Sequence, residues 1–213
     1  MRINAGIDEA GRGCIIGSLF IAGVTLNDYQ VKELQQLGVK DSKLLSSKSR
    51  KKFYNIINNL VAEKCVYKIA PSQIDQYVKY KKLNYLTAIN MAKILDKLQA
   101  DHYYIDSSDV KPERFKATII ENSTKKVDIT CRHHADSTFT VVAAASIIAK
   151  VKRDEEIEEL KKKYGDFGSG YPSDKKTIKF LSNWVNEKKN IPEFARKSWK
   201  TWDKINTTLD SFV

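Results

Sequence analysis

The first seventeen residues, MRINAGIDEAGRGCIIG from Met1 to Gly17, are the stretch from which the rest of the chain is interpreted. Apolar residues alternate with small or polar ones over residues 3–7, and this period of two predicts a short strand. The strand is predicted to end on two acids, Asp8 and Glu9, which lead into a glycine-rich turn. An acidic pair directly after a buried strand is therefore the first feature to explain.

Two neighbouring carboxylates at the end of a buried strand repel each other, which is costly unless a cation neutralises them. Carboxylate oxygens are the ligands that Mg²⁺ and Mn²⁺ prefer, so the pair suggests a divalent metal site. Successive side chains of a regular strand point to opposite faces, so Asp8 and Glu9 can share a site only if the strand ends or bends between them. Gly11 and Gly13 permit such a bend. A solvated acidic pair before a turn is the alternative interpretation.

Length and charge narrow the class of protein. The 213 residues can bury a full core as one domain, with room for a small additional one. The sequence has neither an apolar run of about 18 residues nor a leader-like start, so we expect a cytoplasmic protein with no membrane partner. The net charge of +11 favours a polyanionic partner. A lysine-rich surface that serves solubility or heat tolerance is the alternative.

The three cysteines, Cys14, Cys65 and Cys131, are far apart and lack the spacing of zinc ligands. We expect free thiols in a reducing compartment. Strands mixed with helices predict an α/β or α+β fold, and two adjoining strands at the start predict a mixed sheet. Helices are predicted at residues 47–60 and 79–98, and the longest one ends near Tyr164.

Two further acids occupy comparable positions. Asp106 ends the predicted strand at residues 102–105, and Asp136 lies at the start of the longest helix. Ligand sites of α/β folds form at strand ends, where distant segments converge, so we expect these acids to join Asp8 and Glu9. Carboxylates clustered in a basic protein indicate a nuclease in which one ion activates water and a second stabilises the leaving oxygen. A protein that only binds nucleic acid gains little from acids that repel phosphate.

The segment IDEAGRG, residues 7–13, resembles the opening motif of the type 2 ribonuclease H family (ribonuclease HII). Four later segments resemble motifs of that family in the same order: DSKL at 41–44, YID at 104–106, the acid Asp136 with the helix at 141–150, and GSGYPSD at 168–174. The last of these is similar to the archaeal form of the tyrosine motif. His134 and Thr140 depart from the family, which often has lysine and proline there.

The resemblance implies a ribonuclease H-like α/β core, with a five-stranded mixed sheet flanked by helices, at residues 1–165. A helical C-terminal segment at residues 166–213 is expected to contribute to substrate binding. The implied activity is endonucleolytic cleavage of RNA in RNA–DNA hybrids and at ribonucleotides embedded in duplex DNA, as in ribonucleotide excision repair. Two-metal-ion hydrolysis with Mg²⁺ or Mn²⁺ would leave 3′-hydroxyl and 5′-phosphate ends.

The resemblance also implies roles for individual residues. Four match the catalytic, metal-binding positions: Asp8, Glu9, Asp106 and Asp136. Four match the positions that recognise the ribonucleotide–deoxyribonucleotide junction: Gly11, Arg12, Gly13 and Tyr171. A glycine-rich backbone can hydrogen-bond a 2′-hydroxyl, an arginine suits phosphate, and a tyrosine ring can pack on a deoxyribose. Lys43 is a candidate phosphate contact, with a plain surface lysine as its alternative.

Several residues have simpler interpretations. Asp136 could be a helix cap, and we expect Asp109 to be a loop or capping residue. Two other function classes stay open: another carboxylate-dependent nuclease of ribonuclease H-like fold, such as a junction resolvase, and a non-catalytic basic RNA-binding protein. A monomer is the expected state, and the sequence alone predicts no protein partner such as a clamp.

Overall fold

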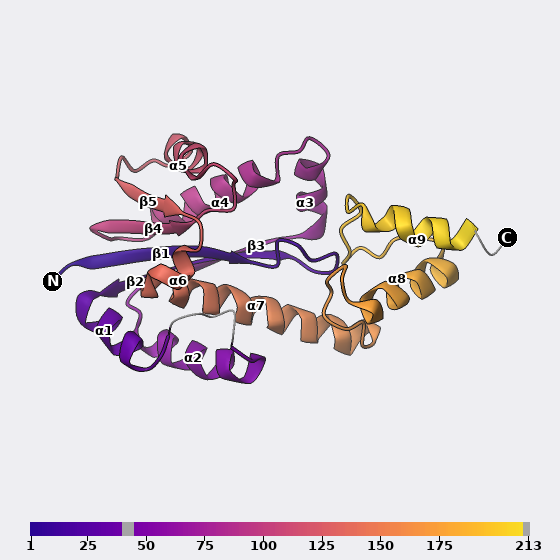
Figure 1. The fold of residues 1–213 in the computed structure, drawn as a ribbon, viewed down its shortest axis with the longest axis horizontal. Coiled ribbons are helices and arrows are strands. Elements are labelled where there is room, and N and C mark those ends of the chain that lie inside the picture. Colours follow the sequence, from indigo (N-terminus) through magenta and orange to yellow (C-terminus); the bar gives the residue numbers. More distant parts are fainter. Residues whose placement is uncertain (40–44, 211–213) are drawn as a thin grey trace. The chain divides into compact units, whose positions relative to one another are not determined.

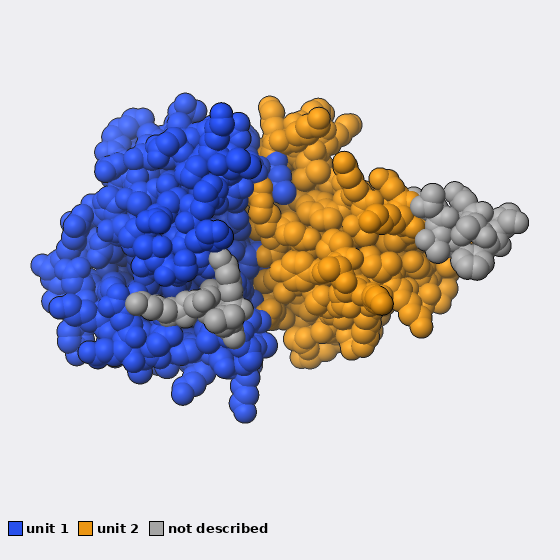
Figure 2. Space-filling view, in the orientation of Figure 1, with its two compact units in different colours: residues 1–10, 20–68, 83–152 blue, residues 11–19, 69–82, 153–213 orange. Residues whose placement is uncertain are grey.

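A computed structural model describes residues 1–39 and 45–210, with side chains in the last helix described as far as Ile205. Lys43 and the rest of its predicted motif lie outside these residues. The chain forms two compact units (Figure 2). Unit 1 comprises residues 1–10, 20–68 and 83–152, and unit 2 comprises residues 11–19, 69–82 and 153–213. The expected domain boundary at residue 165 stays a prediction.

The sheet has five strands in the order β3-β2-β1-β4-β5. The strands are β1 (Ile3–Ala10), β2 (Leu19–Asn27), β3 (Lys64–Ile69), β4 (His102–Asp106) and β5 (Ile129–Arg132). β1 pairs with β2 antiparallel and with β4 parallel, and β4 pairs with β5 parallel. The predicted mixed five-stranded sheet is therefore confirmed, with β1 at its centre.

Helices cover both faces of this sheet (Figure 1). α4 (Leu83–Lys97) and α5 (Pro112–Glu121) lie on one face, and α1 (Asp28–Gln36), α2 (Ser47–Leu60) and the first part of α7 (Thr140–Tyr164) lie on the other. α2 has the bounds that its apolar periodicity predicts. α4 begins later than expected, because Lys81 adopts a left-handed conformation with φ 58°.

Two glycines allow the helices to approach the sheet closely. A Cβ on Gly6 of β1 would lie 2.3 Å from the carbonyl carbon of Val141 in α7. A Cβ on Gly23 of β2 would lie 2.3 Å from Cγ2 of Ile94 in α4. Real Cβ atoms do not come this close to other heavy atoms, so any larger residue would push the helices outward.

Unit 2 has its own apolar core. It contains α3 (Pro71–Val78), α8 (Lys175–Lys188), α9 (Thr201–Asp210) and the second part of α7. Its buried core includes Ile15, Phe167, Leu181, Phe194 and Trp202. Trp199 packs against the same cluster.

Two local predictions are wrong. β1 does not end on the acids but continues as regular strand to Ala10, which pairs with Phe20 of β2. Asp136 does not start the longest helix, because it belongs to a separate short helix, α6 (Ala135–Thr138). The extended backbone of Phe139, with φ −112° and ψ 116°, divides α6 from α7. Within the described residues, no helix is long and apolar enough to span a membrane.

Candidate active site

Asp8 and Asp106 lie on neighbouring parallel strands of unit 1. Gly6 pairs with Tyr104 and Ile7 with Ile105, so the next residues of the two strands are Asp8 and Asp106. Neighbouring strands are about 4.8 Å apart, and paired residues point to the same face. The two carboxylates therefore project side by side from the sheet. By alternation from Gly6, this is the face covered by α7.

Helix α6, which contains Asp136, begins next to Asp106. The backbone N–H of Ala135 donates a 2.7 Å hydrogen bond to Oδ1 of Asp106, so the carboxylate of β4 holds the first turn of α6. Asp136, the next residue, is 4% exposed. His134 precedes this turn in the left-handed conformation, with φ 55°, and reverses the chain after β5. Helix α6 thus begins beside the carboxylate of Asp106, one residue before Asp136.

Glu9 lies one residue beyond Asp8 on the continuing strand, so alternation directs it to the opposite face of the sheet. Its backbone N–H donates a 2.7 Å hydrogen bond to Oδ1 of Asp8. Its negative charge also acts on Asp8, as the electrostatics of that group show. The strand continues without a bend between the two acids, so Glu9 acts on Asp8 through its charge, and a metal site that both acids share stays a prediction.

Asp8 is a buried anion among like charges. Burial raises the pKa of Asp8 well above its ordinary value, and the charges of Glu9 and Asp106 raise it further. The side chain of Ser146 and the backbone of Glu9 hydrogen-bond Asp8 and oppose this shift in pKa. A cation at this position would stabilise the ionised form, so the site has the electrostatics of a cation-binding site.

Ser146 is a part of the site that the sequence interpretation missed. It lies on α7, is fully buried, and hydrogen-bonds Asp8. The close approach at Gly6 brings α7 near enough for this contact. The available signal is a single hydroxyl inside the otherwise apolar run from Val141 to Ala149. A buried hydroxyl in such a run needs a hydrogen-bond partner, and Asp8 provides one.

The four acids fit divalent metal ions in charge and in donor chemistry. Among the described residues, no three Asp, Glu, His or Cys side chains are grouped closely enough to enclose an ion by themselves. Mg²⁺ usually keeps several waters and is held by one or two carboxylates together with substrate phosphates. A site that supplies pairs of carboxylates, rather than a complete cage, fits this kind of binding.

Asp109 is a contrasting carboxylate close to Asp106 in the chain. It is 4% exposed, and it accepts hydrogen bonds from Nη2 of Arg114 at 2.6 Å, Nδ2 of Asn84 at 2.8 Å and the N–H of Lys111 at 2.9 Å. Burial raises the pKa of Asp109, but these hydrogen bonds outweigh burial and lower it to about 2. Asp109 therefore orders the loop after β4, in agreement with its predicted structural role.

Unit 2 gathers the residues predicted to recognise the junction. Gly11 has φ +88°, a conformation that L side chains rarely adopt. A Cβ on Gly13 would lie 4.0 Å from Cε1 of Tyr171, so this loop and the tyrosine motif are in contact distance. Backbone N–H groups of Ile15 and Ile16 donate to the carbonyl of Gly170, at 2.9 and 3.1 Å, and join the two segments.

Arg153 is a second residue that the sequence interpretation missed. Its guanidinium carbon lies 4.7 Å from the centre of the Tyr171 ring, and its Nη2 donates to the carbonyl of Ser169 at 2.5 Å. The cation packs against the ring and fixes its orientation. Burial raises the pKa of the Tyr171 hydroxyl, which stays protonated at neutral pH. Tyr171 is 36% exposed, so part of the side chain is available to a ligand.

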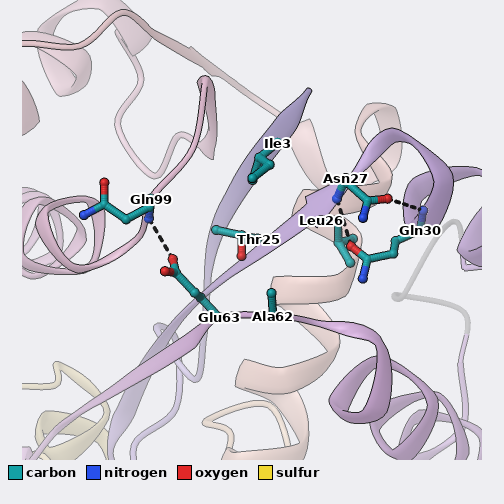
Figure 3. A pocket seen from close by; sticks show the side chains of 8 residues that line it. All are labelled: Ile3, Thr25, Leu26, Asn27, Gln30, Ala62, Glu63 and Gln99. Carbon is teal, nitrogen blue, oxygen red and sulfur yellow. Dashed lines mark hydrogen bonds between the residues drawn. The ribbon is translucent and has the colours of Figure 1, made fainter. Parts of the chain in front are cut away.

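One pocket of unit 1 contains none of the predicted residues. It lies at the start of β1, near Ile3, whereas the acids lie toward the other end of that strand (Figure 3). Its polar side chains bond within the pocket wall: Glu63 accepts from the N–H of Gln99 at 2.7 Å, and Asn27 and Gln30 cap α1 reciprocally. The pocket therefore adds no group to the acidic site.

Comparisons with known proteins are consistent with this geometry. Residues 5–202 match the family model described as Ribonuclease HII. The Ribonuclease HII of Methanosarcina barkeri is 44% identical over 214 residues, and the alignment covers 96% of each chain.

Solved structures give the same result. The ribonuclease H2 from Pyrococcus horikoshii OT3 superposes with a TM-score of 0.90 and 37% identity, covering 98% of this chain and 99% of the other. The structure of a PCNA:RNase HII complex from Archaeoglobus fulgidus contains a chain that matches with a TM-score of 0.85 and 42% identity. That match covers 93% of this chain and 95% of the other.

Proposed function

The chain belongs to the ribonuclease HII family, and we propose that it cleaves RNA in RNA–DNA hybrids and at single ribonucleotides in duplex DNA. The observation that supports the proposal is the pair of carboxylates, Asp8 and Asp106, on neighbouring strands, with Glu9 adjacent to Asp8 and Asp136 one residue after the N–H that binds Asp106. Hydrolysis would leave 3′-hydroxyl and 5′-phosphate ends. The net charge of +11 supports a nucleic-acid substrate.

Divalent metal ions complete this site in the proposal. Mg²⁺ or Mn²⁺, two ions in the active complex, would be held by the four acids: Asp8, Glu9, Asp106 and Asp136. When bound, such ions supply charge stabilisation for the attacking and leaving oxygens of the displacement. The raised pKa of Asp8 supports this assignment, because a buried, repelling carboxylate gains most from a neighbouring cation.

The chain's own hydrogen bonds hold the carboxylates in place. Glu9 N–H and Ser146 bind Asp8, and Ala135 N–H binds Asp106. These contacts restrict the rotation of two acids before substrate arrives, so less order has to be created on binding. For Asp8 they compensate the cost of burial only in part.

In the proposal, residues of unit 2 recognise the ribonucleotide–deoxyribonucleotide junction. The backbone of residues 11–13 would hydrogen-bond the 2′-hydroxyl that distinguishes a ribonucleotide, and Tyr171 would pack on the adjacent deoxyribose. Arg12 would contact phosphate, as would Lys43. The 4.0 Å separation between the Gly13 Cβ position and the Tyr171 ring supports a shared role. A cytoplasmic monomer acting in ribonucleotide excision repair is part of the proposal.

A single experiment tests this function. The protein is incubated with duplex DNA that contains one ribonucleotide, with Mg²⁺, with Mn²⁺ and with neither. We expect one cut at the ribonucleotide that requires a divalent ion and produces a 3′-hydroxyl end. Cleavage of all-DNA junctions would indicate a different nuclease, and binding without cleavage would indicate an RNA-binding protein.

A further inference from the structure

Arg196 is a fully buried cation in unit 2, with an exposed fraction of 0%. Its guanidinium donates three hydrogen bonds, all to backbone carbonyls of one segment. Nη2 binds the carbonyl of Gly11 at 2.5 Å, Nη1 binds that of Arg12 at 2.7 Å, and Nε binds that of Gly17 at 3.0 Å. A residue near the C-terminal end of the chain therefore holds the glycine-rich loop near its start.

The position of Arg196 is itself fixed by several contacts. Its backbone N–H donates to the carbonyl of Ile15 at 2.8 Å, and its own carbonyl accepts from Nε1 of Trp202 at 2.8 Å. The guanidinium carbon lies 4.8 Å from the centre of the Trp199 ring. The segment between α8 and α9 therefore places the planar guanidinium of Arg196, with its N–H donors, next to the carbonyls of the glycine-rich loop.

The three hydrogen bonds decide which way the loop amides point. The described peptide bonds are all trans, so the carbonyl of one residue and the N–H of the next point in opposite directions. The carbonyls of Gly11 and Arg12 point to the buried guanidinium. The N–H groups in the same two peptide planes, those of Arg12 and Gly13, therefore point away from the interior. Gly13 is exposed and Arg12 is half-buried, as this orientation requires.

We propose that Arg196 is a positioning residue for ribonucleotide recognition, because it directs the N–H groups of Arg12 and Gly13 outward as two donors for a 2′-hydroxyl. The inference deepens the proposed function and rests on it. Arg196 does not touch the substrate. It acts through the loop, and it links the C-terminal segment to substrate choice without any contact between that segment and nucleic acid.

Arginine is the residue that this role requires. Three carbonyls that surround one side chain need donors in a fixed planar arrangement, which a guanidinium has. A lysine keeps the positive charge but presents a compact ammonium group, and it cannot reach the three carbonyls with the same geometry. The loop would then lose at least one buried hydrogen bond, and the freed peptide plane could rotate.

The variant Arg196→Lys tests the proposal against a control of equal burial. Leu181→Ala removes a fully buried side chain from the same core, and an apolar side chain donates no hydrogen bond to the loop carbonyls. The measurements are kcat/KM on duplex DNA with one ribonucleotide, the inhibition constant of an all-DNA duplex of the same sequence, and the melting temperature. The Mg²⁺ concentration for half-maximal rate is measured alongside.

We expect Arg196→Lys to lower kcat/KM for the ribonucleotide duplex by roughly tenfold or more. The inhibition constant of the all-DNA duplex and the Mg²⁺ midpoint should stay within about twofold, because phosphate contacts and the acids are unchanged. Leu181→Ala should melt at a lower temperature but keep the wild-type ratio between the two duplexes. The proposal would be overturned if Arg196→Lys kept the wild-type kcat/KM for the ribonucleotide duplex. It would also be overturned if the affinity for the all-DNA duplex fell by the same factor as kcat/KM.

A second measurement needs no variant. Amide hydrogen exchange of Gly13 in the wild-type protein should be fast without ligand. In metal-free solution it should slow when the ribonucleotide duplex is added, and should slow much less with the all-DNA duplex. Slow exchange of the Gly13 amide in the free protein would show that it points inward. If wild-type protein fails to cleave, the proposed function fails, whereas normal cleavage with this amide pointing inward defeats only the role of Arg196.

Discussion

Asp8 in unit 1 and Arg196 in unit 2 are both buried charges, but their surroundings are opposite. Asp8 is 5% exposed and lies near two further carboxylates, so burial and repulsion raise its pKa. Arg196 is 0% exposed and donates to three carbonyls, which compensate its charge within the fold. Burial lowers the pKa of Arg196 to about 10, so it stays charged at neutral pH.

The difference separates a charge that needs a ligand from a charge that holds the protein together. Asp8 is compensated only in part by Ser146 and the backbone of Glu9, and an external cation would complete its environment. Arg196 needs nothing from outside. The two units therefore use buried charge for different purposes, chemistry in one and conformation in the other.

The largest effect should follow from removing the charge of Asp8. We expect Asp8→Asn to lower the cleavage rate by at least about a thousandfold, because one of the acids proposed to hold the metal is lost. Substrate binding should persist or tighten, since a negative charge near phosphate is removed. The free energy of unfolding should stay equal or rise, since repulsion is relieved. Cleavage rates, duplex binding and thermal melting measure these effects.

Asp109→Asn is the matched control for that variant, because it also neutralises a buried carboxylate of unit 1. It should reduce stability while preserving most of the cleavage per folded molecule. If Asp8→Asn cleaved at the wild-type rate, Asp8 would not belong to the active site. The contrast between the two units would then not hold.

Removing the buried cation should have the opposite effect on stability. We expect Arg196→Met to lower the free energy of unfolding by about 3 kcal/mol, because three buried carbonyls lose their donors. Denaturant unfolding checks this value. Lys179→Met also replaces a cation by methionine, but at an exposed position of α8. It should change the free energy of unfolding by less than about 0.5 kcal/mol. If Arg196→Met and the wild type had the same free energy of unfolding, the three hydrogen bonds of Arg196 would not stabilise the fold.

Variants of Tyr171 test whether substrate recognition can be changed without changing metal binding. We expect Tyr171→Ala to lower cleavage of a single embedded ribonucleotide by about ten- to a hundredfold, as for loss of a stacking contact of roughly 1–3 kcal/mol. The Mg²⁺ midpoint should not move. Tyr171→Phe keeps the ring over Arg153 and should have a small effect. A variant Tyr171→Ala that melts many degrees lower yet cleaves normally in the cold would make the residue structural.

The smallest effect concerns Asp109 and pH. Its pKa of about 2 lies below the value of about 3.9 for an unfolded Asp, so its stabilisation is complete above about pH 4. The stabilisation is lost as the pH falls toward 2, because the unfolded chain then binds more protons. We expect melting curves to show a loss of about 1.5 kcal/mol over this range that Asp109→Asn lacks. Parallel pH curves for both proteins would exclude this role.

The sequence predicted the sheet, and its motifs pointed to all four acids, because strand patterns and acids at strand ends are local signals. It did not predict that β1 continues through Glu9 to Ala10, since glycine at residue 11 permits a bend without requiring one. The break at Phe139 was also hidden, because an apolar run does not show where one helix ends and the next begins.

Arg196 and Arg153 could not be predicted, for a different reason. Their partners include backbone carbonyls, such as those of Gly11 and Ser169, and a carbonyl leaves no residue type in the sequence to pair with the arginine. Ser146 was the recoverable case, as a single hydroxyl among apolar neighbours. Contacts between side chains of distinctive type can be anticipated, whereas contacts to backbone need coordinates.

The pairing of β1 has a consequence for folding. β1 pairs with β2 over short separations, Ala10 with Phe20 at the nearest, and such hairpins form within microseconds. The pairing of Asn4 with His102 spans 98 residues, and contacts of this separation form late because a long loop must close first. During synthesis Asp8 therefore leaves the ribosome long before Asp106 exists. We therefore expect the carboxylates of Asp8 and Asp106 to meet late in folding, when the hydrophobic core around β1 can hold them together.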